Sequence, residues 1–163
     1  MTNATSPTTQ TGVLALENPV FCAYLISSCL LVVKMMLVAL MTAYKRKVHK
    51  AFLSPEDADF NKEGQVVVHD AVERMRRAHQ NDLENIPIFW CSAFAYLWIR
   101  PSIAVACFLF FGFTIFRFFH TIVYTIIIAP QPTRAILFIA GLSITAYMAI
   151  HSIVVAFENF LWK

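Results

Sequence analysis

The sequence predicts an all-α integral membrane protein, a single domain over residues 1–163 built as a four-helix bundle. Of its residues, 58% are hydrophobic and 14% are charged, whereas a soluble domain averages about 25% charge. Three apolar runs reach the length of about 20 residues that crosses a bilayer. Because lipid offers the backbone no hydrogen-bond partners, we expect each run to be helical. The low charge excludes a disordered chain, and only four glycines exclude a collagen-like one.

The first helix is expected over residues 20–44. Asn18-Pro19 gives a helix start just before it, and Lys34 is the only charge inside it. A basic cluster from Lys45 to Lys50 follows and predicts an anchor at the membrane interface.

The loop expected over residues 45–71 is the longest hydrophilic segment. Eight of the thirteen Lys and Arg residues lie between Lys45 and Arg77, and positive charge is retained on the cytosolic side of membranes. We therefore expect this loop in the cytosol and both termini on the other side. Within the loop, Ser54-Pro55-Glu56-Asp57 predicts a helix start, with a capping hydroxyl, an early proline and acids near the positive helix end.

The second helix is expected over residues 72–99, with a cytosolic extension at its start. Its apolar part, residues 86–99, is too short to span a bilayer alone, so polar residues before it must lie in or near the hydrocarbon. At helical spacing, one stripe of this helix holds Arg74, Arg77, Asn81 and Glu84.

Two further helices complete the bundle, over residues 102–129 and 133–161. The first of them carries a matching polar stripe, formed by Arg117, His120 and Tyr124. A rigid turn, Pro130-Gln131-Pro132, joins the two helices, and Arg134 lies at the start of the last one.

The polar residues of the four helices converge on the cytosolic third of the bundle. Charges at that depth cost several kcal/mol unless they are paired or face a wet cavity. Anchoring and pairing between helices account for Arg74 and Arg76 but suit Glu84 and Arg117 poorly. We therefore predict a polar pocket open to the cytosol, with Glu84 and Arg117 facing it.

The chemistry of this pocket indicates its ligand class. Cations match carboxylates and Glu84 matches an ammonium, so the ligand is a small zwitterion or peptide with excess negative charge. The lipid-accessible helices around it suit a second, hydrophobic ligand. Arg134, at a helix start, is suited to holding a thiolate or an oxyanion. The sequence lacks hydrolase and NTPase motifs and metal-ligand spacing, so we expect no metal and no nucleic-acid partner.

Three smaller features carry structural rather than functional expectations. The four cysteines lie inside apolar runs without a CxxC pair, which favours free buried thiols. Asn3 starts an Asn-X-Thr match, which we expect to stay unmodified because such matches are common. The first helix lacks signal-peptide features and is expected to act as an uncleaved targeting signal.

Residues 72–85, Val-Glu-Arg-Met-Arg-Arg-Ala-His-Gln-Asn-Asp-Leu-Glu-Asn, closely resemble the signature of the membrane-associated proteins in eicosanoid and glutathione metabolism, the MAPEG family. The microsomal glutathione transferase branch is the more similar one, and the prostaglandin E synthase branch comes next. The resemblance extends over residues 20–150 and includes Lys34-Met35-Met36, Ala51-Phe52, Pro55-Glu56-Asp57-Ala58, Arg117-Phe118-Phe119-His120-Thr121 and Pro130-Gln131-Pro132-Thr133-Arg134-Ala135.

The resemblance implies a homotrimer that binds glutathione, as co-substrate, between neighbouring subunits near the cytosol. Arg134 matches the arginine that stabilises the glutathione thiolate and is the expected catalytic residue. The implied activity is a glutathione transferase and peroxidase acting on hydrophobic electrophiles or lipid hydroperoxides. The implied location is the endoplasmic reticulum membrane, with the mitochondrial outer membrane as a second one. The implied glutathione contacts are Arg77, Asn81, Glu84, Arg117, His120 and Tyr124, with His79, Arg46 and Lys34 as further candidates.

Departures from the family pattern bear on which activity is expected. Ala135 stands where the prostaglandin synthase branch has serine, and Gln80 stands where it has arginine, so transferase or peroxidase chemistry is favoured over prostaglandin isomerisation. Ala58 replaces a cysteine of the transferase branch, which argues against activation by thiol modification there. A non-catalytic lipid-binding scaffold is the alternative from another class, and a channel or transporter would need polar residues along the whole bundle.

Overall fold

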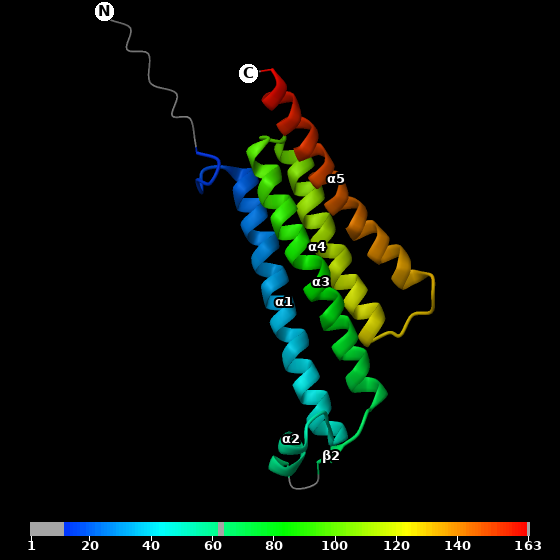
Figure 1. Ribbon diagram of the computed structural model, residues 1–163. Coiled ribbons are helices and arrows are strands. Elements are labelled where there is room, and N and C mark those ends of the chain that lie inside the picture. The colour runs from blue at the N-terminus through cyan, green and yellow to red at the C-terminus, as the bar shows by residue number, and fades with distance from the viewer. Residues whose placement is uncertain (1–11, 62–63, 163) are drawn as a thin grey trace, which may run out of the picture.

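A computed structural model of the chain describes residues 12–61 and 64–162. Within these residues four long helices lie side by side: α1 (Pro19–His49), α3 (Asp70–Trp98), α4 (Ile103–Thr125) and α5 (Thr133–Leu161) (Figure 1). The prediction of an all-α, four-helix membrane bundle is confirmed. Asn3 lies outside the described residues, so its expected lack of modification stays a prediction.

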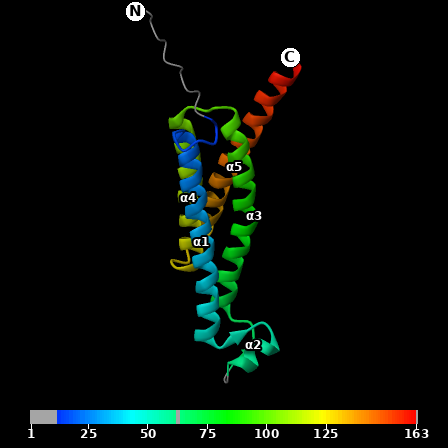
Figure 2. The same ribbon diagram turned by 90° about the vertical axis from the view of Figure 1, so that its left-hand side faces the viewer.

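The two central helices of the bundle are α3 and α4, since each contacts the other three long helices. By length and composition, α1, α4 and α5 could cross a membrane. The first half of α3 is too polar for α3 to count as a spanning helix by composition. α3 nevertheless lies side by side with the apolar helices (Figure 2). The start of α1 and the end of α5 lie at the same end of the bundle (Figures 1 and 2).

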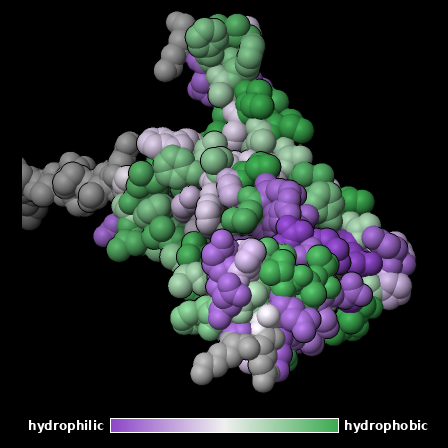
Figure 3. Space-filling view, turned by 60° about the horizontal axis from the view of Figure 1, so that its bottom comes forward, coloured by the Kyte–Doolittle hydropathy of each residue, from purple (hydrophilic) through white to green (hydrophobic). Residues whose placement is uncertain are grey.

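The opposite end of the bundle carries the short elements of the loop. These are α2 (Pro55–Phe60) and a parallel pair of two-residue strands, β1 (Ala51–Phe52) and β2 (Gln65–Val66). Ser54 caps α2 by accepting a hydrogen bond from the Asp57 N–H at 3.3 Å, which confirms the predicted helix start. Hydrophilic side chains gather on this end (Figure 3).

The ends of two helices differ by more than two residues from the sequence prediction. α1 continues past residue 44 to His49, because its basic residues extend the helix until Lys50 adopts a left-handed conformation with φ of 52°. α4 ends at Thr125 rather than at residue 129. The helical conformation is disfavoured for a residue that precedes a proline, as Ala129 does, so the helix must end before it.

The hydrophobic core fixes α3 against α4. The rings of Phe89 and Phe113 stack with centroids 4.0 Å apart, and Phe110 meets Phe89 edge to face at 6.3 Å. Leu31 of α1 and Met148 of α5 are fully buried in the same cluster. This packing sets the position of the polar residues that lie one or two turns away, before Phe89 on α3 and after Phe113 on α4.

The outer surface of the helices is apolar. Along α5, large side chains such as Ile139, Ile150 and Phe157 are more than half exposed. Such a surface is expected of helices that face lipid or another subunit. All four cysteines are free thiols, as predicted, but the expectation that they are buried is wrong: Cys29 and Cys91 lie on this exposed surface, and Cys22 and Cys107 are half-buried.

Candidate active site

A buried carboxylate joins three helices in the interior of the bundle. Asp82 of α3 is fully buried and forms ion pairs with Lys34 of α1 and Arg117 of α4, which are 3% and 1% exposed. The expectation that Arg117 faces a water-accessible pocket is therefore wrong. Its guanidinium pairs between helices instead, because a buried carboxylate without cations nearby would be strongly destabilising.

Arg117 also connects this ion cluster to the surface of the bundle. Its Nη2 atom donates to Asp82 and, at 2.8 Å, to Oδ1 of Asn81. The Asn81 oxygen is thus occupied. Its main-chain carbonyl accepts a hydrogen bond from the side-chain amide of Asn85 at 2.8 Å. The side chain of Asn81 is held in one orientation, with its NH₂ group left to donate elsewhere.

A polar cleft of about 330 Å³ opens beside Asn81. It lies between α3, α4, the α4–α5 connection and the start of α5. Of the predicted site residues, four line it together: Asn81, His120, Tyr124 and Arg134. The sequence prediction that these residues share one pocket thus agrees with the geometry of a single chain.

The aromatic residues of the cleft hold the Arg134 guanidinium in place. The guanidinium carbon of Arg134 lies 5.0 Å from the centroid of the Tyr124 ring, a cation–π arrangement. The His120 ring in turn stacks on Tyr124 at 5.8 Å with an interplanar angle of 27°. Because both aromatic residues lie on α4 and Arg134 begins α5, this stack fixes the start of α5 against the end of α4.

Two nitrogen atoms at the cleft have no hydrogen-bond partner among the described residues. They are Nε of Arg134 and Nδ1 of His120, and both are enclosed. An enclosed polar nitrogen without a partner is destabilising unless a ligand or water satisfies it. The cleft is therefore lined by a guanidinium, an imidazole and a side-chain amide.

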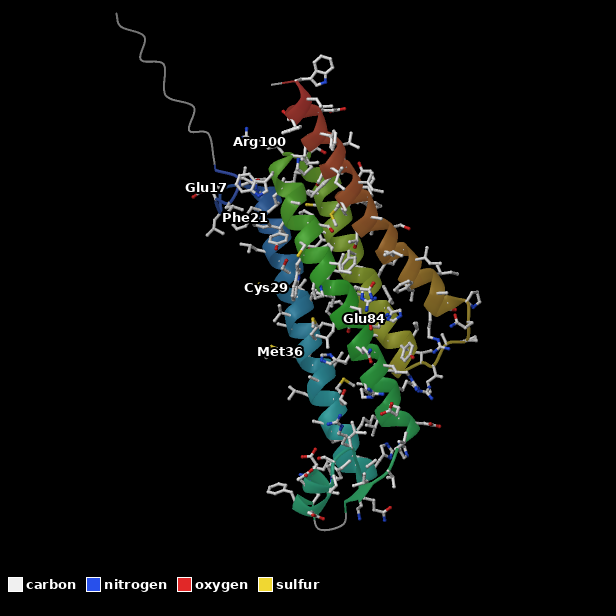
Figure 4. The ribbon with its side chains drawn as sticks, viewed as in Figure 1. Glu17, Phe21, Cys29, Met36, Glu84 and Arg100 are labelled. Atoms are coloured by element: carbon white, nitrogen blue, oxygen red, sulfur yellow. The ribbon has the colours of Figure 1, made fainter. Side chains whose placement is uncertain are left out.

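The other predicted site residues lie outside this cleft. Arg77 and Glu84 are exposed on α3, and Glu84 accepts a hydrogen bond from Gln80 at 3.3 Å (Figure 4 labels Glu84). Arg46 and His79 are half-buried, and the Nε atom of Arg46 and the Nδ1 atom of His79 have no partner in the described part of the chain.

Sequence reasoning gave no role to Asp82 and did not identify Gln131 and Phe138, which also line the cleft. The helical spacing in the sequence did indicate a buried position for Asp82. It lies four residues from both Ala78 and Ile86, which are fully buried on the same face of α3. A carboxylate at a core position of an amphipathic helix needs a buried cation, and Lys34 and Arg117 were the intramembrane cations available.

The model of the MAPEG family matches residues 24–154 of the chain. Microsomal glutathione S-transferase 1 of Bos taurus is 38% identical over 139 residues, covering 82% of this chain and 89% of the relative. The human protein of that name is 37% identical over the same length and shares. Human prostaglandin E synthase is 40% identical over 112 residues, covering 68% of this chain and 74% of the relative. This chain belongs to the MAPEG family.

Proposed function

We propose that this protein is a glutathione-dependent membrane enzyme, a transferase that conjugates glutathione to hydrophobic electrophiles and also reduces lipid hydroperoxides. One observation carries the proposal: Arg134, Tyr124, His120 and Asn81 line one cleft of about 330 Å³, where two enclosed nitrogen atoms have no partner among the described residues. The names of the transferase and synthase relatives support glutathione as the co-substrate.

Arg134 is the residue proposed to activate the thiol. A free thiol with a pKa near 8.5 is only a few per cent ionised at pH 7. Each unit by which its pKa falls corresponds to about 1.4 kcal/mol of preferential thiolate binding. The positive charge of the Arg134 guanidinium, which lines the cleft, supplies that preference, and the Tyr124 ring holds it in place.

The same glutathione thiolate would carry out both activities. In conjugation, the thiolate sulfur forms a bond to carbon of the electrophile, the leaving group departs with its electron pair, and the thiol proton goes to solvent. In peroxide reduction, two glutathione molecules are oxidised to one disulfide while the hydroperoxide becomes an alcohol and water. Holding both reactants in one site lowers the barrier through proximity.

The exposed candidates suggest that the site is completed by a second copy of the chain. Arg77 and Glu84 lie outside the cleft of a single chain, as do Arg46 and His79. In the proposed homotrimer, these side chains reach glutathione bound between neighbouring subunits, Glu84 meeting its ammonium and the cations its carboxylates. Arg117 then supports the site indirectly, by orienting Asn81.

The proposed location is the endoplasmic reticulum membrane, with α2 and the cleft on the cytosolic side. The hydrophilic end of the bundle and its cluster of basic residues support this orientation. Glutathione would then enter from the cytosol, and the apolar co-substrate would enter from lipid along the exposed faces of the helices.

A second candidate function is prostaglandin E synthesis, favoured by the 40–41% identity to prostaglandin E synthases. Ala135 lines the cleft at the position next to Arg134, so no hydroxyl group is available from that residue. This supports the transferase. The alternative from another class is a lipid-binding scaffold without catalysis.

The test is steady-state kinetics of the purified, lipid-reconstituted protein. Glutathione is offered with an aryl halide, with a lipid hydroperoxide and with the substrate of a prostaglandin E synthase assay, alongside a direct glutathione-binding measurement. Turnover of the halide or the hydroperoxide is expected. Binding without turnover in any arm would favour the scaffold, and turnover confined to the prostaglandin arm would favour the synthase.

A further inference from the structure

A second pocket, of about 300 Å³, lies between the ends of α1, α3 and α4. It shares no lining residue with the cleft at Arg134. Its polar lining comes from Lys45, His69, Asp70, Arg74 and Thr125. None of these residues takes part in the proposed glutathione chemistry, so the pocket needs an explanation of its own.

The groups lining this pocket carry a net positive charge, because Lys45 and Arg74 outnumber the one carboxylate, Asp70. Lys45 of α1 and Arg74 of α3 are both half-buried, and neither forms a salt bridge with a carboxylate among the described residues. Asp70 lies four residues before Arg74, the spacing that favours a pair on a helix, but the two do not meet. Two partly buried cations that share a cavity favour an anion between them.

The start of α3 does not by itself supply this anion site. His69 already caps it: its Nδ1 accepts from the Ala71 N–H at 3.3 Å, and its carbonyl accepts from the N–H groups of Val72 and Glu73 at 2.9 and 3.0 Å. The N–H groups of Ala71, Val72 and Glu73 are therefore satisfied internally. Affinity for an anion must come from the side chains of Lys45 and Arg74, with only the field of the helix dipole added.

The surroundings of the pocket are apolar in a way that suits a lipid. Met75 and Ile128 contribute to its wall. Next to Ile128 along the chain, Ile126 and Ile127 are 63% and 66% exposed. A free phosphate ion would gain nothing from these side chains, whereas an acyl chain could lie along them. The pocket also lies at the end of the bundle where hydrophilic side chains gather (Figure 3), and this is the end that we expect at the level of the lipid headgroups.

We propose that this pocket binds the phosphate of an anionic phospholipid, held by Lys45 and Arg74, with an acyl chain along Ile126–Ile128. Basic pockets between membrane helices on the cytosolic side are a recurrent way to bind such headgroups. The phosphate links the end of α1 to the start of α3. Bound anionic lipid therefore stabilises the bundle where its two basic segments would otherwise repel.

The test compares two double variants of equal charge at the same end of the molecule. Lys45→Gln with Arg74→Gln removes the two cations of the pocket, and Lys47→Gln with Arg76→Gln removes two exposed cations outside it. Binding of dioleoyl phosphatidic acid and of dioleoyl phosphatidylcholine is followed by native mass spectrometry. At about 1 kcal/mol for each lost contact to the phosphate, the pocket variant should bind phosphatidic acid about thirtyfold more weakly, and the control, whose cations do not reach the phosphate, should bind as the parent does.

Two further sets of variants separate loss of the pocket from loss of folding. Ala71→Leu fills the pocket without changing its charge and should also weaken binding, since Ala71 is part of its lining. The single variants Lys45→Gln and Arg74→Gln, each with about half of the effect, replace the double variant if its unfolding temperature in phosphatidylcholine shows that it does not fold.

Three results would overturn the proposal. Equal loss in both double variants would mean diffuse attraction to the basic surface rather than a site. Unchanged binding in the pocket variants would exclude Lys45 and Arg74. Displacement of the lipid by millimolar inorganic phosphate, with the same thermal stabilisation from phosphate alone, would identify a free ion as the ligand.

Discussion

Arg117 of α4 and Asp82 of α3, 35 residues apart in the sequence, form a buried ion pair in the interior of the bundle. The same Asp82 carboxylate also pairs with Lys34 of α1. Three helices are therefore joined through one acidic side chain. Since Arg117 also orients Asn81, this interior cluster supports the cleft in which we propose that glutathione binds.

The first prediction concerns Asp82. Asp82→Asn leaves Lys34 and Arg117 as two buried cations without a counter-charge. Breaking a buried ion pair by removing one partner typically costs about 3–5 kcal/mol, so the free energy of unfolding in detergent should fall by about that amount. Asp59→Asn, an exposed change on α2, is the control and should leave stability unchanged. Parental stability in Asp82→Asn would refute the structural role of the cluster.

Arg134 is predicted to control turnover rather than assembly. If its guanidinium lowers the thiol pKa from about 8.5 by one to two units, the thiolate fraction at pH 7, and with it conjugation, should fall about eightfold to twenty-five-fold in Arg134→Ala. The oligomeric state in detergent should not change. Arg134→Lys, which keeps the charge but not the planar donor fork, should give an intermediate rate. Parental turnover in Arg134→Ala would remove this residue from the mechanism.

Tyr124 is predicted to act through its ring. The Arg134 guanidinium lies over that ring, and a cation–π contact contributes about 0.5–2 kcal/mol. Tyr124→Leu should therefore lower kcat/KM for glutathione by about twofold to thirtyfold, while Tyr124→Phe should keep most of the parental value. Equal losses in the two variants would show that the hydroxyl group, and not the ring, is what the site requires.

Glu73 is predicted to give a small pH dependence to stability. The hydrogen bonds from Arg76, at 2.7–3.1 Å, lower the pKa of the Glu73 carboxyl below its ordinary value of 4.5. Because the pKa is lowered in the folded state, the stabilisation is present above pH 4.5 and is lost as the pH falls below it. Thermal unfolding scans should show a slightly smaller acid loss in Glu73→Gln than in the parent, and an unchanged loss in the control Glu56→Gln. A larger acid loss in Glu73→Gln would contradict the sign.

The proposed orientation predicts which segment a protease can reach. Trypsin added to sealed vesicles whose cytosolic face is outward should cleave between Lys45 and Arg77, where eight of the thirteen basic residues lie. Trypsin does not cleave before proline, as at Arg100-Pro101, so the other end of the bundle is probed with a Glu-specific protease, from which Glu17 should be protected until detergent is added (Figure 4). Cleavage at Glu17 in sealed vesicles, with the loop protected from trypsin, would invert the topology.

The sequence alone was sufficient for the architecture. Long apolar runs leave helices as the favoured solution in lipid, so four helices and an all-α bundle could be predicted, as could the start of α2 at Ser54. The ends of helices were less predictable. α1 continues through a basic segment to His49, and α4 stops before Pro130, because charged residues can extend a helix into water while a proline restricts the residue before it.

Sequence by itself also determined which residue types carry the chemistry: Asn81, His120, Tyr124 and Arg134 could be singled out from helical spacing and the family resemblance. Only the tertiary structure decided which of the other polar residues are partners of one another. Arg117 and Lys34 turn inward to Asp82, whereas Arg77 and Glu84 stay exposed. Spacing defines the face of one helix, but whether a charge is neutralised depends on what the neighbouring helices bring within ångströms of it.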